Sequence, residues 1–218
     1  MNPTYRTILT LDWVAIVLFI ALVLLSVSKY FFSVNFRMFL ILPFNDKYLK
    51  TSRKKGKLFN WFHVVLTVFQ IMVLSLFVFL SNNILKGQRI DFYPILYWIL
   101  LFSLVAFVCL KVILQFGNGY FFQNVQTMAN LVFEKLTYFN YSALLAFVGC
   151  ILLAYVLPDS KTLVYVITTG VILINLIGFI KVLRNHQKLI VTNFIYFILY
   201  LCTLEISPLV IIVSYLKD

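Results

Sequence analysis

Glu205 is the residue with the clearest potential for chemistry, because it lies in the middle of an apolar run near the C-terminus. An ionised carboxylate at the centre of a membrane is costly, so such a group must be protonated, paired or exposed to a water-filled cavity. Pro208 follows three residues later, where it removes one backbone donor and leaves the carbonyl of Leu204 without its usual partner. An acid beside a kinked helix is a candidate proton or ion site.

Two other apolar runs each carry an amide near the same depth, Gln70 and Asn175. If the three helices are neighbours, these amides form one polar layer with Glu205, and Tyr200 is a further hydrogen-bond partner. The layer could bind protons or ions, or it could simply hold helices together, at about 0.6 kcal/mol per hydrogen bond on average. The sequence favours the second interpretation, because Glu205 has neither a buried cation nor a second acid beside it.

A second set of polar residues follows Gly117-Asn118-Gly119, which we expect to end a helix. Its members recur every three or four residues, as on one face of a helix: Gln123, Gln126, Asn130 and Glu134. We therefore expect a separate amphipathic helix at the membrane surface or docked under the bundle. Helices that lie on lipid usually carry Lys and Arg on the wet face, so this stripe of amides could contact protein as well as solvent.

Arg53, Lys54, Lys55 and Lys57 place four charges in five residues just before an apolar run. Such a cluster attracts anionic lipid headgroups at roughly 1 kcal/mol per residue. The plainer interpretation, which the sequence favours, is that the cluster only keeps this connection in the cytoplasm.

Residues that could bind a metal or catalyse a reaction are sparse. The three cysteines lie in apolar stretches and have no second thiol at ligand spacing. His63 and His186 have no Cys, Asp or Glu at ligand spacing. We expect no metal, no cofactor and no catalytic residue.

The composition determines the class of protein in which these residues act. Apolar residues make up 63% of the 218 residues and charged residues only 11%, whereas soluble domains are about a quarter charged. The net charge of +11 does not indicate a nucleic-acid-binding protein, because the basic residues flank apolar runs. The chain is expected to be a single integral membrane domain, residues 1–218.

Runs of about twenty apolar residues predict six transmembrane helices. They cover residues 13–32, 58–80, 94–116, 139–157, 162–183 and 193–215. The predicted fold is an all-α membrane bundle, since only helices satisfy the backbone of such runs in lipid. The pattern around Phe36, Phe39 and Leu40 predicts an interfacial helix in the first connection as well.

Lys and Arg are distributed unequally over the two sides of this six-helix topology. Thirteen lie on the side shared by the first, third and fifth connections, and five lie on the other side. Because basic residues accumulate in the cytoplasm, both termini are predicted to be periplasmic.

The chain resembles a family of inner-membrane proteins of Bacteroidota known only as a domain of unknown function. Three segments carry the resemblance: Phe44-Asn45-Asp46-Lys47-Tyr48-Leu49, Phe139-Asn140 and, most specifically, the ten residues from Tyr200 to Leu209, which include Glu205 and Pro208. The resemblance implies a multi-span helical fold in a bacterial inner membrane and gives the Glu205 site more weight. It implies no activity.

Three functions remain open. The first is a non-enzymatic subunit or assembly factor of a bacterial inner-membrane complex, surrounded by membrane lipids and bound to membrane-protein partners. Its contacts would be the amide stripe and a row of small residues, Ala143, Ala146, Cys150 and Ala154. The second is a small proton- or ion-coupled transporter that uses Glu205, and the third is a lipid-handling enzyme near Asp46.

Overall fold

The computed structural model describes residues 12–42, 61–86, 94–121, 125–158 and 160–185. The regular elements in these ranges are all helical: α1 (Asp12–Phe31), α2 (Ser33–Leu40), α4 (Trp61–Leu85), α5 (Pro94–Phe121), α6 (Val125–Ile151), η1 (Leu152–Val156) and α7 (Lys161–Asn185). Five of them are long and apolar enough to cross a membrane. The predicted all-α membrane bundle is therefore confirmed, while the sixth predicted span, residues 193–215, lies outside the described residues.

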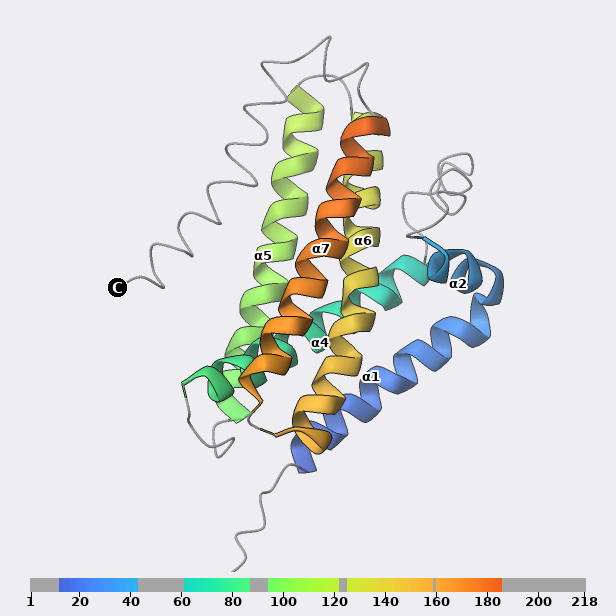
Figure 1. Ribbon diagram of the computed structural model, residues 1–218. Helices are drawn as coiled ribbons and strands as arrows, with labels where there is room; N and C mark the ends of the chain where they lie inside the picture. The colour runs from blue at the N-terminus through green and yellow to red at the C-terminus, as the bar shows by residue number, and fades with distance from the viewer. Residues whose placement is uncertain (1–11, 43–60, 87–93, 122–124, 159, 186–218) are drawn as a thin grey trace, which may run out of the picture.

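Helix α6 is the centre of the bundle, since it packs against α4, α5 and α7. Figure 1 shows α5, α6 and α7 running alongside one another, while α1 and α4 cross them at an angle. Helix α1 packs on α4, and the short α2 continues from it around a corner. This arrangement leaves α4 between α1 and α6, and thirteen of its side chains are buried.

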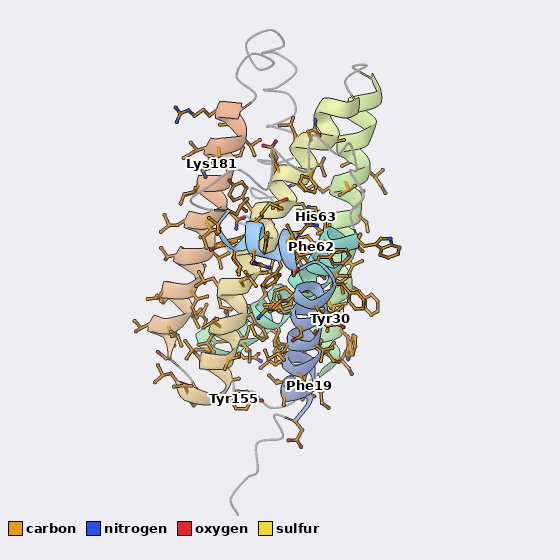
Figure 2. All side chains as sticks on the ribbon, turned by 90° about the vertical axis from the view of Figure 1, so that its right-hand side faces the viewer. Phe19, Tyr30, Phe62, His63, Tyr155 and Lys181 are labelled. Atoms are coloured by element: carbon orange, nitrogen blue, oxygen red, sulfur yellow. The ribbon has the colours of Figure 1, made fainter. Side chains whose placement is uncertain are left out.

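The interior consists of two groups of buried side chains. The larger includes Phe69, Val73 and Leu76 of α4, together with Ala143 and Ala146 of α6. The smaller is aromatic and lies where α2 meets the start of α4: Phe39, Leu42, Phe62, Leu66, Phe133 and Tyr138. In Figure 2, Phe62 and His63 lie toward the same end of the bundle as Lys181, and Tyr155 lies at the opposite end.

The interfacial helix predicted in the first connection is present as α2. Phe39 is fully buried, and its ring contacts the rings of Phe62 and Tyr141 at centroid distances of 6.0 and 5.7 Å. Arg37 on the other face of α2 is exposed. Helix α2 therefore packs its apolar side on the corner where α1 meets the start of α4.

The third connection differs from the prediction in two ways. Gly117-Asn118-Gly119 does not end a helix, because α5 continues to Phe121; a glycine inside a helix costs only about 1 kcal/mol. The separate amphipathic helix is also wrong, because Val125 to Ile151 form one continuous helix. The polar stripe that suggested a surface helix instead continues into the membrane-crossing part of α6, where some of its residues are buried.

Successive long helices run in opposite directions, so most of their basic residues gather at one end of the bundle. Among the described residues, Lys29, Arg37, Lys111, Lys135, Lys181 and Arg184 lie toward one end of the bundle, and Lys86 and Lys161 lie at the other. The asymmetry has the same sense as the one expected from the sequence. Which end faces the cytoplasm stays a prediction.

Candidate functional site

Polar residues on α4 and α6 face each other across the centre of the bundle. On α4, His63, Thr67 and Gln70 are spaced by four and three residues, which places them on one face of the helix. On α6, Thr137 and Asn140 have the same kind of spacing. The two helices run in the same direction, since His63 meets Asn140 and, further along, the thiol of Cys150 approaches the carbonyl of Val73 at 3.9 Å.

His63 is the hub of this polar cluster, which we define as His63, Thr67, Thr137 and Asn140. The Nδ2 of Asn140 lies 2.9 Å from Nδ1 of His63 and 3.5 Å from the hydroxyl of Thr67. The other ring nitrogen, Nε2, lies 3.3 Å from the hydroxyl of Thr137 and 3.4 Å from the carbonyl oxygen of Phe133. His63, Thr137 and Asn140 are all buried, and the Phe133 ring packs edge-on against the imidazole at 4.6 Å.

The hydrogen-bond directions in the polar cluster follow from its two threonines. The hydroxyl of Thr67 donates to the carbonyl of His63 at 2.9 Å, and the hydroxyl of Thr137 donates to the carbonyl of Phe133 at 2.6 Å. Both hydroxyl oxygens are then acceptors for the remaining contacts. Asn140 therefore donates to Nδ1, and the proton of a neutral imidazole is on Nε2.

This proton arrangement does not suit base catalysis, although a hydroxyl, an imidazole and an amide lie in sequence. A general base must offer a lone pair to the hydroxyl that it activates. Here Nε2 carries the proton on the side of Thr137, and the hydrogen of Thr137 points to Phe133. As arranged, the polar cluster ties α4 to α6.

Asn175 makes a second polar connection, from α7 to α6. Its Nδ2 donates to the hydroxyl of Ser142 at 3.2 Å and to the carbonyl of Val171 on its own helix at 2.9 Å. Gln70 is buried on α4, and its carbonyl oxygen has no hydrogen-bond partner among the described residues. The carbonyl oxygen of Asn175 also has no partner among the described residues, so Gln70 and Asn175 are not hydrogen-bonded to each other, and the polar layer with Glu205 stays a prediction.

The residues of the predicted interaction stripe have different surroundings. Glu134 is fully buried next to Phe133, and Asn130 is half-buried. Gln126 belongs to α6, but its side chain is not described, and Gln123 lies outside the described residues. At the same end of the bundle, the amine of Lys135 lies over the ring of Phe179 at 5.5 Å, and the amine of Lys111 lies over Phe139 at 5.7 Å.

Several other predicted site residues lie outside the described residues. They are Glu205, Pro208 and Tyr200 of the intramembrane site and the basic run Arg53, Lys54, Lys55 and Lys57. Their roles stay predictions. Among the residues that the structure does describe, no group of three His, Cys, Asp or Glu side chains could hold a metal ion.

The polar cluster was not predicted from the sequence. His63 was considered only as a metal or catalytic residue, and Asn140 only as part of a family segment. The available signal was helical spacing of polar residues inside two apolar runs: His63 and Thr67 are four residues apart, and Thr137 and Asn140 are three apart. Such pairs mark the face that one helix turns to another.

Comparison with known proteins gives one match. The model of a family described as "Domain of unknown function (DUF4271)" matches residues 14–216, nearly the whole chain. No curated protein and no solved structure matches significantly.

Proposed function

The chain belongs to the DUF4271 family, and from that premise we propose that it is a non-enzymatic component of a bacterial inner-membrane complex, either a subunit or an assembly factor. Its task in this proposal is to bind another membrane protein within the bilayer. Helix α5 carries the argument.

Among the described residues, helix α5 is attached to the bundle along a narrow edge. Tyr97 is its only buried side chain among those described, although the helix spans 28 residues. Large aromatic side chains lie on the outward face: Trp98 is 53% exposed and Phe102 is 66% exposed, and their rings are tilted by 34° with centroids 6.4 Å apart. Because lipid is as apolar as these side chains, helices associate in membranes through close packing, for which an aromatic ridge on a weakly attached helix is a suitable surface.

The row of small residues is already used inside the chain. Ala143, Ala146 and Cys150 are fully buried, and Ala154 is 5% exposed. This row therefore packs α6 against its neighbours in the bundle, and the proposed partner surface is on α5 instead.

The polar cluster supports a non-enzymatic role. Its hydroxyl hydrogens are donated to backbone carbonyls, and its imidazole presents a proton rather than a lone pair to Thr137. The two hydroxyl hydrogens stay within their own helices, while the contacts of His63 with Thr137 and Asn140 join α4 to α6. Neither set of hydrogen bonds prepares a nucleophile.

Site-specific photo-crosslinking in native membranes tests the proposal. A photoreactive residue at Phe102 is compared with one at Phe19 of α1, because the two phenylalanines are 66% and 67% exposed. We expect a single protein adduct from position 102 and lipid adducts alone from position 19. Lipid adducts alone from both positions would contradict the proposal.

Purification in a mild detergent followed by mass spectrometry tests the same proposal independently. The partner that crosslinks at position 102 should co-purify in stoichiometric amounts, be lost from Phe102→Ala and be retained by Phe19→Ala. Loss of the partner from Glu205→Gln would make Glu205 part of the assembly. A protein that is isolated alone in every case would favour the transporter, which proton-flux measurements in liposomes with Glu205→Gln would then test.

A further inference from the structure

We propose that the imidazole of His63 is a reversible proton-binding site, and that the side-chain amide of Asn140 turns over to accept a hydrogen bond from the second N–H when the proton is bound. This inference rests on the geometry of the polar cluster. It does not depend on whether the chain has a partner protein.

The neutral site has one polar atom without a partner. Asn140 uses its Nδ2 for both His63 and Thr67, so its carbonyl oxygen Oδ1 points elsewhere. Asn140 is 1% exposed, and Oδ1 has no hydrogen-bond partner among the described residues. A buried oxygen without a hydrogen-bond partner is unfavourable, so the amide has an unused acceptor beside the imidazole.

The protonated site can use that acceptor. When hydronium transfers a proton to Nδ1, an N–H bond forms, an O–H bond of hydronium breaks to release water, and the ring becomes a cation with two donors. Nδ2 of Asn140 can no longer donate to Nδ1, whereas a half-turn of the amide brings Oδ1 to the same position. Nε2 keeps its acceptors on Thr137 and Phe133, so both ring nitrogens are hydrogen-bonded in both states.

His63 lies close to the N-terminal end of α4. It is the third residue of α4, and Trp61 at the start of the helix is 76% exposed. The start of α4 is therefore the side from which a proton would reach the imidazole.

The charged groups on the neighbouring helices include one that would favour the imidazolium of His63 and several that oppose it. Buried Glu134, adjacent to Phe133 on α6, is the one acid that the described residues place toward this end, and its ionised form would favour the imidazolium. Basic groups on the neighbouring elements oppose it: Lys29 of α1, Arg37 of α2, Lys111 of α5, Lys135 of α6 and Lys181 of α7. Tyr138 and Tyr141 are further titratable side chains of α6.

Nitrogen-15 NMR of ring-labelled histidine tests the proposal on an intact polar cluster. The chain contains two histidines, so His186→Gln leaves His63 as the only labelled ring. At about pH 8 we expect two well-separated resonances with the proton on Nε2, and on acidification toward about pH 5 we expect both to move to the similar positions of an imidazolium. Two unchanged resonances over the whole range in which circular dichroism shows a folded protein would overturn the proposal.

Variants of Asn140 separate proton binding from ordinary packing. Asn140→Asp can only accept from Nδ1, so the imidazolium should appear at higher pH, whereas Asn140→Leu should move its appearance to lower pH or abolish it. Thr137→Val is the matched control, because Nε2 keeps the carbonyl of Phe133 as an acceptor; it should change the titration less than Asn140→Leu. Equal titrations of Asn140→Asp, Asn140→Leu and the parent would show that the amide plays no part and would overturn its proposed role.

Discussion

Tyr138 of α6 packs its ring directly on the backbone of Gly178 in α7, so that a Cβ atom at position 178 would overlap the ring. The same two helices approach closely at Gly149, where a Cβ would lie 2.6 Å from Ile167, and at Gly170, where it would lie 2.6 Å from Leu145. Helices in lipid associate through such close packing. The glycines thus determine how near α7 comes to the central helix.

Gly178→Ala should destabilise the protein by about 1–3 kcal/mol, because the atoms in the way are Cβ and Cγ of Tyr138, which cannot move without the helix. Unfolding in mixed micelles of increasing SDS content, followed by circular dichroism, measures the change. Gly117→Ala in α5 is the control: nothing lies within 4 Å of the added atom, so it should be neutral or stabilise by up to about 1 kcal/mol. Equal effects of the two substitutions would be inconsistent with close packing at position 178.

His63 and Asn140 should be energetically coupled. In a double-mutant cycle with His63→Leu and Asn140→Leu, we expect a coupling free energy of about 0.5–2 kcal/mol, since each substitution leaves the other partner buried without its hydrogen bond. The same unfolding measurement applies. Ser26→Ala provides the reference, because Ser26 is exposed and bonds only to the carbonyl of Leu22 on its own helix; its effect should add to that of Asn140→Leu.

Gln70→Leu and Asn175→Leu should have different effects. Gln70→Leu removes a buried carbonyl oxygen without a partner among the described residues, so stability should be unchanged or increased. Asn175→Leu breaks the hydrogen bond to Ser142 between α7 and α6 and should cost about 0.6 kcal/mol. A clear loss of stability in Gln70→Leu would instead support the predicted polar layer, in which Glu205 supplies the missing partner.

The end of the bundle that carries most basic residues should face the cytoplasm. After replacement of Cys109, Cys150 and Cys202, single cysteines at Lys161 and Arg184 report on the two ends of α7. A membrane-impermeant maleimide added to intact cells should label Lys161→Cys, whereas Arg184→Cys should react only after the membrane is opened. The reverse pattern would mean that the orientation predicted from the basic residues is wrong.

Helix boundaries could be predicted where a helix ends at a change from apolar to polar residues, and less well where a helix continues through such a change. Helix α7, residues 161–185, differs from the predicted span by one or two residues at each end. The sequence pattern divides α6 wrongly, because the polar first turns of this helix have the spacing of a surface helix. The error arose because a buried polar face and a solvent-exposed polar face have the same spacing in the sequence, and only the position of a neighbouring helix distinguishes them.

The sequence by itself determined that the described spans are helices and that the protein belongs in a membrane. Both properties are local: in lipid every backbone donor and acceptor must be satisfied within its own helix, so the length and apolarity of a run are sufficient. Only the tertiary structure decided that His63 meets Asn140, 77 residues away, and that Tyr138 lies on Gly178. In lipid, apolarity does not favour one helix face over another, so the choice of partners depends on shape and hydrogen bonds, which appear only when the helices are side by side.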